Sequence, residues 1–418
     1  MLKDEADREP ALPIGRLMPF DSSERRKTYL LEFPSGAKLR ISAVAKKVVE
    51  LRWRGEKPGA IAAKITAGGD ERSVQYVDEL LARIRGLEQN GIKQPDPGFG
   101  LRTTLFNPST VTRMGSAFAW AYSKPALVVN ACIVIAALLT WFGARPERRA
   151  PHLEPSVLAV GYIAYFATLF IHEMGHAAAC VRVGGRPGRI GFTIYLIFPA
   201  LFNDVGAIWS LPRHKRIVVD LGGLYFHSII AAIFALVGIT LHYASLIFAI
   251  DLILLTIVLN LNPFFKFDGY WILSDAFGVH NLGRETVKVL KSLISALAGF
   301  ERFKSPWPPL TSALLILYAG ATAIVWSFFA IRVIKALGAQ LHVILMTVMP
   351  VWSGGHALTG VELRHLGFAI GGALLTMYLA ARILRRGLNL GEYVKLLRSG
   401  MRGRGPDSKL TGVGDESS

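Results

Sequence analysis

The apolar stretch VGYIAYFATLFIHEMGHAAAC, residues 160–180, carries His172, Glu173 and His176 within the length of one membrane-crossing helix. A charged side chain at membrane depth costs about 2.5–3.5 kcal/mol, so ionisable residues there need partners. Histidines four positions apart lie on one helix face and can bind one metal ion. The spacing predicts a zinc site, with Glu173 placed beside it as a general base. The structural alternative is a pair of histidines that make a helix contact without a metal.

A third ligand is needed, because a catalytic zinc ion takes three protein ligands and leaves one position open. The segment NLNPFFKFDG, residues 260–269, closes another apolar run, and its Pro263 and Gly269 interrupt regular helix. Asp268 is the candidate ligand. Non-helical backbone at membrane depth is tolerated only where it is buried in protein or lines a wet cavity, which is where a hydrolytic site must also lie. Taken alone, the segment could be a turn that ends a helix.

Together the two motifs resemble the site-2 protease family of intramembrane zinc metalloproteases. That family combines HExxH with a later N-x-x-P-x-P-x-x-D-G segment, and Asn260, Pro263, Asp268 and Gly269 match it. Phe265 stands where the family has its second proline, which puts the detailed shape of the loop in doubt.

The continuation DGYWILSD, residues 268–275, resembles the peptide zinc metalloprotease branch, which is associated with bacterial peptide maturation or export. The resemblance extends over residues 155–280. It implies that His172, His176 and Asp268 bind Zn²⁺, that Glu173 activates water, and that Asn260 contacts the substrate.

Composition favours an integral membrane protein, since 52% of the residues are hydrophobic and the mean hydropathy is +0.38 despite a net charge of +17. Six runs are long enough to span a bilayer. They are residues 125–143, 156–181, 217–240, 244–263, 310–331 and 366–384. Two shorter runs, 190–208 and 340–353, are expected to be re-entrant or interfacial. The first resembles the substrate-admitting hairpin of the family.

Basic residues indicate the orientation in the membrane. Lys and Arg form three clusters: one directly after the HExxH helix, one between residues 266 and 291, and one in the C-terminal tail. Arg145, Arg148 and Arg149 favour the opposite orientation, but they are fewer. By the positive-inside rule both termini and the metal-bearing helix ends lie in the cytoplasm, and the protein belongs to the cell inner membrane. The tail is interpreted as a solvated charge run, so no nucleic-acid partner is expected.

A small α+β domain precedes the first span. A hairpin over residues 29–41 is followed by a helix that begins at Ser42 and two further helices up to residue 90. This region resembles the winged-helix PqqD domains that hold leader peptides. Strand addition of a peptide and simple packing on the membrane portion are both open for it. The expected domain division is a flexible N-terminus (1–24), a PqqD-like domain (25–95), a linker (96–123), a transmembrane metalloprotease domain (124–386) and a basic cytoplasmic tail (387–418).

The predicted fold is therefore an all-α polytopic membrane protein with a small N-terminal winged-helix-like domain. The predicted function is a zinc-dependent endopeptidase that cuts a membrane-embedded or leader-peptide substrate, with membrane lipid and peptide-export or maturation proteins as partners. The alternatives are regulated proteolysis of a signalling protein such as an anti-sigma factor, and a metal-binding scaffold without proteolysis. His227 has two interpretations, an interhelical hydrogen bond or an additional contact to metal or substrate.

Overall fold

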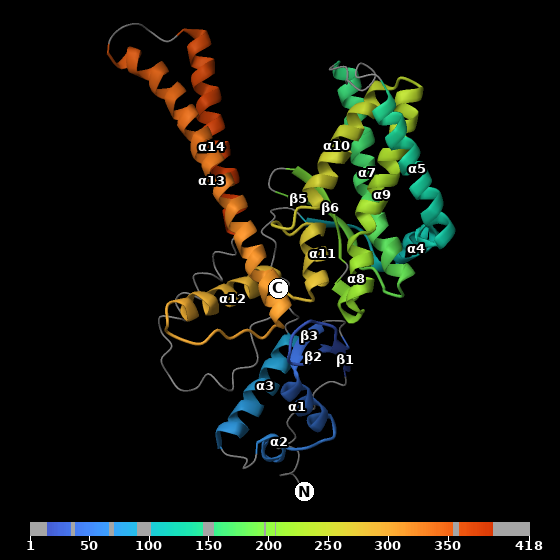
Figure 1. Cartoon of the computed structure of the whole chain (residues 1–418), viewed down its shortest axis with the longest axis vertical. Helices are drawn as coiled ribbons and strands as arrows, with labels where there is room; N and C mark the ends of the chain where they lie inside the picture. The colour runs from blue at the N-terminus through green and yellow to red at the C-terminus, as the bar shows by residue number, and fades with distance from the viewer. Residues whose placement is uncertain are drawn as a thin grey trace, which may run out of the picture.

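The computed structural model describes residues 15–34, 38–66, 71–89, 102–144, 154–195, 198–204, 206–353 and 359–387. A small α+β domain lies at one end of a group of long helices (Figure 1). The basic tail beyond residue 387, the first 14 residues and the arginines at 145–149 fall outside the described residues.

The N-terminal domain is built on a three-stranded antiparallel sheet in the order β1-β2-β3, with β1 at Arg16–Phe20, β2 at Thr28–Glu32 and β3 at Lys38–Ser42. Ser42 begins the first helix, because its Oγ accepts a hydrogen bond from the backbone N–H of Ala45 at 3.2 Å. The helices are α1 (Ala43–Trp53), α2 (Pro58–Ile65) and α3 (Glu71–Gln89). Their inner faces and the sheet share one buried core.

The hairpin and the three helices agree with the sequence-based expectation, whereas β1 does not. The expected domain begins at residue 25, but β1 pairs with β2 from Arg16 onward. Pro19 weakens the strand signal of this segment, because proline cannot donate to a ladder and is found on edge strands. β1 is an edge strand of this sheet, so it tolerates the proline. The likeness to winged-helix domains stays a prediction.

The region at 96–123, which was expected to be a linker, has regular secondary structure in the part that the structure describes. It contains β4 (Arg102–Phe106), α4 (Pro108–Phe118) and the short helix η1 (Ala119–Tyr122). Asn107 begins α4 by accepting a hydrogen bond from Thr110 N–H at 3.0 Å. β4 pairs with β5 (Ile190–Tyr195), which forms a hairpin with β6 (Phe198–Asn203). The pairing of β4 could not be read locally, since its partner lies far along the chain.

A bundle of helices contains α5, α7, α9 and α10 (Figure 1), and α9 contacts each of the other three. The bounds are α5 Lys124–Gly143, α7 Pro155–Arg182, α8 Arg213–Asp220, α9 Gly222–Thr240 and α10 Ala244–Asn260. α7 and α9 approach closely at two glycines, because a Cβ on Gly175 would lie 2.2 Å from the carbonyl oxygen of Gly222. Small residues permit such close helix packing in membranes. The hydroxyl of Tyr122 donates to the Gly175 carbonyl at 3.0 Å and so ties η1 to this crossing.

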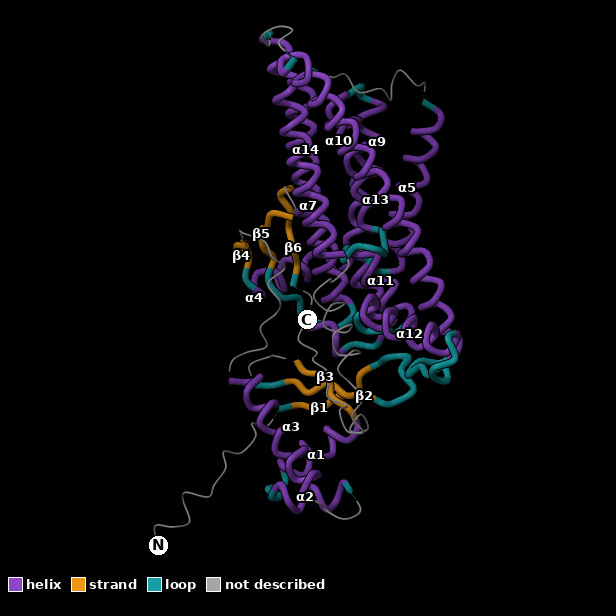
Figure 2. The backbone as a smooth tube through the Cα atoms, turned by 90° about the vertical axis from the view of Figure 1, so that its left-hand side faces the viewer, coloured by secondary structure: helices purple, strands orange, loops and turns teal. Residues whose placement is uncertain are grey.

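The remaining helices are α11 (Asp268–Phe277), α12 (Leu282–Leu297), α13 (Pro309–Trp352) and α14 (Gly360–Gly387). α13 and α14 form a long hairpin that diverges from the bundle, and α12 lies across its base (Figure 1). Figure 2 shows the N-terminal domain beneath both groups of helices.

Within the residues that the structure describes, five helices are long and apolar enough to cross a membrane: Lys124–Gly143, Pro155–Arg182, Arg213–Thr240, Pro309–Trp352 and Gly360–Ala381. The remaining expected span, 244–263, corresponds to α10, whose 17 residues rise only about 25 Å. The expected separate segment at 340–353 is wrong, because these residues continue α13 without a break. Pro350 lies inside this helix, two residues before its end, and Gly338 between the two apolar halves costs the helix only about 1 kcal/mol.

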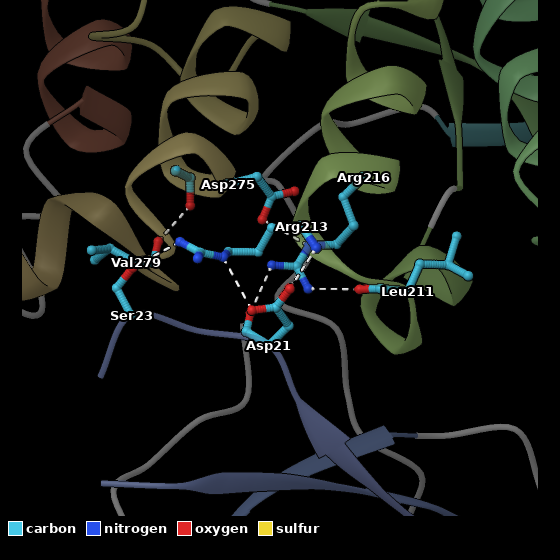
Figure 3. Close-up of polar contacts among 8 residues, drawn as sticks. Asp21, Ser23, Leu211, Arg213, Arg216, Asp275 and Val279 are labelled. Atoms are coloured by element: carbon cyan, nitrogen blue, oxygen red, sulfur yellow. Dashed lines mark hydrogen bonds and ion pairs between the residues drawn. The ribbon is translucent and has the colours of Figure 1, made fainter. Parts of the chain in front are cut away.

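The N-terminal domain is docked on the membrane portion through a polar cluster around α8 (Figure 3). Asp21 accepts from the backbone N–H and the Nε of Arg213 at 2.9 and 3.1 Å. Arg216 donates to the Asp21 carbonyl at 3.1 Å and to Asp275 of α11 at 2.8 Å. Nearby, Ser23 N–H donates to the carbonyl of Gly278 at 2.9 Å. The domain therefore packs on α8 and α11.

Candidate metal centre

α7 carries the HExxH residues about two turns before its C-terminal end at Arg182. His172, Glu173 and His176 are all buried, with exposed fractions of 5%, 9% and 7%. The apolar sequence on both sides keeps the helix regular, so the two imidazoles lie one turn apart on the face toward α9 and α11. Their ring centroids are 4.9 Å apart.

Asp268 joins the two histidines from α11, although about ninety residues separate them in the chain. Nε2 of His172 and Nε2 of His176 are 3.2 Å apart. The Asp268 carboxylate lies 3.1 Å from the first nitrogen and 3.4 Å from the second. Four ligands around zinc with bonds of 2.0–2.1 Å are separated by about 3.3 Å, so the three measured separations fit three corners of such a tetrahedron.

The donor atoms face a shared point, and two further observations agree with a metal there. Asp268 Oδ2 is buried and has no hydrogen-bond partner, even though an imidazole nitrogen lies 3.1 Å away. Nδ1 of His176 is 2.8 Å from the carbonyl oxygen of Val219. A carbonyl only accepts, so Nδ1 carries the proton and Nε2 is left to face Asp268.

Gly223 leaves room beside the two nitrogens. A Cβ at this position would lie 2.4 Å from His172 Nε2 and 2.5 Å from His176 Nε2, so any side chain would enter the space that these atoms share. His172, His176 and Asp268 form a group that could hold a metal ion. The lack of a side chain at position 223 leaves room for it.

Asp268 reaches this place because the segment after α10 folds back on itself. It is the first residue of α11, where the helix dipole favours a carboxylate. A Cβ on Gly269 would lie 2.3 Å from the carbonyl oxygen of Leu261, so the turn closes only with glycine. Burial alone would raise the pKa of the Asp268 carboxyl, but His176 and His172 outweigh burial and hold this pKa below its ordinary value. The group is therefore ionised and able to ligate.

Glu173 adjoins the group without belonging to it. It is buried and interacts electrostatically with His172, His176 and Asp268. Its backbone carbonyl accepts a hydrogen bond from the side chain of Asn203 at 3.2 Å. This contact places the end of β6 against the HExxH turn. The expected hairpin at 190–208 is thus present beside the site as β5 and β6, while its depth in the membrane stays a prediction.

Asn260, the expected substrate contact, is half-buried at the end of α10. Its carbonyl oxygen lies close to Gly269, at 2.9 Å from where a Cβ would stand. The backbone thus brings residue 260 next to the Asp268 turn. The role of its side chain stays a prediction.

Several residues of the site were not predicted from sequence. Gly223 had a local signal, the Gly222-Gly223 pair that begins an otherwise bulky apolar helix. Val219 contributes only a backbone carbonyl, which no sequence pattern marks. The contact of Asn203 with the Glu173 carbonyl depends on the packing of β6 against α7, which no local pattern marks.

No protein-family model matches the chain, and no solved structure matches it. A curated protein does match: "Putative peptide zinc metalloprotease protein YydH" of Bacillus subtilis (strain 168) is 28% identical over 113 residues. The likeness supports a relation to zinc metalloproteases. The match covers 27% of this chain and 45% of that protein, so the chain spans less than half the length of the relative.

Proposed function

We propose that the chain is a zinc-dependent endopeptidase of the site-2 protease type, which hydrolyses a peptide bond in a membrane-associated protein or peptide. One observation carries the proposal. Two imidazole nitrogens and a carboxylate converge at 3.1–3.4 Å between apolar helices, with Glu173 buried beside them. The name of the Bacillus relative supports the same chemistry.

In this proposal His172, His176 and Asp268 hold the ion. When bound, zinc supplies Lewis acidity that polarises the scissile carbonyl and lowers the pKa of a water molecule toward about 7. Glu173 accepts the proton of the attacking water and returns it to the leaving amine, as a general base and then a general acid. The apolar surroundings on α7 and α9 exclude bulk water, which strengthens these electrostatic interactions.

The substrate must present an extended backbone, because the amides of an intact helix are bonded internally. β5 and β6 lie against the HExxH turn through Asn203, and we propose that this hairpin admits the peptide. Asn260 would hold its backbone by hydrogen bonds. Peptide maturation or export is the proposed role, with the docked N-terminal domain delivering a leader peptide.

The proposed location is the inner membrane with both termini in the cytoplasm. Support comes from the basic residues that follow α7 and occupy α8, at the same end as the N-terminal domain.

The test compares the purified wild-type chain with Glu173→Gln in liposomes, with zinc per chain and cleavage of membrane and leader peptides as readouts. We expect about one zinc ion per chain in both and cleavage by the wild type alone, because glutamine keeps the shape but takes no proton. Absence of zinc from the wild type would refute the ligand set. Cleavage by Glu173→Gln at the wild-type rate would refute the role of Glu173.

A further inference from the structure

His227 on α9 makes two polar contacts inside the bundle. Its side chain is fully buried, with 0% exposed. Its Nδ1 lies 3.2 Å from Nδ1 of His172, and its Nε2 lies 3.1 Å from the carbonyl oxygen of Thr168. The rings of His172 and His227 pack against each other with centroids 4.5 Å apart and planes tilted by 49°.

These contacts determine where the protons lie. The Thr168 carbonyl can only accept, so Nε2 of His227 carries a hydrogen. A neutral imidazole has one N–H, so Nδ1 of His227 is an acceptor and the proton between the two rings belongs to Nδ1 of His172. Nε2 of His172 is then the nitrogen that faces His176 and Asp268.

We propose that His227 is a positioning residue for the metal centre: it fixes the tautomer and the ring orientation of His172. The inference rests on the proposed function, since it concerns the same ligand group. His227 acts through His172 and does not itself join the donor atoms, which are His172, His176 and Asp268. A hydrogen-bond partner on the second ring nitrogen is what metal-binding histidines generally require.

The two ligand histidines are supported by different acceptors, each from the α8–α9 segment. His176 donates to the backbone carbonyl of Val219, which no substitution removes. His172 depends on a side chain, so its support can be tested by mutation. A neutral imidazole suits this place, because a carboxylate would add another buried negative charge to those of Asp268 and Glu173.

Two substitutions separate the hydrogen bond from the packing. His227→Asn keeps an acceptor on Cγ, where Nδ1 of histidine stands, while it removes much of the ring. His227→Leu fills more of the space but accepts no hydrogen bond. Ser228→Ala is the matched control on the same helix, because the Ser228 hydroxyl donates only to the Tyr225 carbonyl of its own turn.

The measurement is the zinc dissociation constant of the purified full-length chain in detergent, by competition with a chromophoric chelator, together with its thermal unfolding. We expect His227→Leu to bind zinc about 10- to 100-fold more weakly than the wild type. His227→Asn should retain most of the affinity, and Ser228→Ala all of it.

Wild-type affinity in His227→Leu would overturn the inference. So would an equal loss in His227→Asn and His227→Leu, since packing alone would then explain the effect. No zinc binding by the wild type would overturn the ligand set itself, an outcome that is visible without any cleavage assay.

Discussion

The Arg216 guanidinium lies 2.8 Å from the Asp275 carboxylate and joins α8 to α11 beneath the metal-ligand group. Both helices support a ligand: α8 carries Val219, the acceptor for His176, and α11 begins at Asp268. Arg216 is 4% exposed and also donates to the carbonyls of Asp21 and Leu211 at 3.1 Å each. One buried side chain thus connects the N-terminal domain with both supports.

Loss of this guanidinium should destabilise the protein strongly. Arg216→Met removes the nearest cation from the Asp275 carboxylate, which is 20% exposed, so we expect a loss at the lower end of the about 3–5 kcal/mol that breaking a buried pair costs. Burial already raises the pKa of Asp275 while Arg216 counteracts the increase, so removal of Arg216 should raise this pKa further. Denaturant unfolding and zinc retention measure the effect.

The neighbouring pair between Arg213 and Asp21 is the matched comparison. Its side chains are 34% and 44% exposed. Because solvent screens the pair, Arg213→Ala should lower the free energy of unfolding by less than about 1 kcal/mol. Equal losses in the two variants would show that burial does not distinguish them.

A methyl group at position 223 should block metal binding without changing the donor atoms. In Gly223→Ala the new Cβ would stand 2.4–2.5 Å from both Nε2 atoms, in the space between His172 and His176. We expect loss of zinc, measured as metal per chain after gel filtration. Gly320→Ala on α13 is the control, because no atom beyond its own stretch of helix lies within 4 Å of the position of its Cβ. A zinc-replete Gly223→Ala protein would contradict the proposed position of the ion.

Removal of the carboxylate should weaken zinc binding more than any change at His227. Asp268→Asn removes a charged ligand. Loss of a residue that only hydrogen-bonds to a ligand weakens metal binding by up to about 100-fold, so we expect the affinity of Asp268→Asn for zinc to fall by more than that. The same chelator competition measures it. A loss smaller than that of His227→Leu would contradict a ligand role for Asp268.

Acid should weaken the contact between the N-terminal domain and the membrane portion. His280 packs edge-on against the stacked rings of Trp209 and Phe20, with centroid distances of 4.2 and 6.3 Å. Burial lowers the pKa of His280, and together with the nearby cations of Arg40 and Arg216 it brings this pKa to about 3. The unfolded chain has a pKa near 6.5, so this stabilisation is complete above pH 6.5 and is lost as the pH falls toward 3.

Denaturant titration between pH 7 and 4, followed by tryptophan fluorescence, tests this dependence. The wild type should lose up to about 1.4 kcal/mol per pH unit through this one group. His280→Gln cannot titrate and should show a shallower slope. Identical slopes would assign the acid sensitivity to other groups.

Local sequence was sufficient for the features that depend on neighbouring residues. His172 and His176 share a helix face because they are four positions apart, and Ser42 begins α1 because its hydroxyl reaches a backbone N–H three residues ahead. The long apolar helices follow from hydropathy, which is also local. The third ligand was a candidate because Pro263 and Gly269 interrupt the helix around Asp268, and its meeting with the histidines became visible only in the structure.

Tertiary packing decided the rest, because it depends on contacts that no window of sequence contains. His227 meets His172 only because Gly175 and Gly222 let α7 and α9 approach closely. β1 and β4 are weak strands alone and form through their partners β2 and β5. Arg216 was one basic residue among many in the sequence. Folding buries it against Asp275, because only the three-dimensional arrangement brings α8, α11 and the N-terminal domain together.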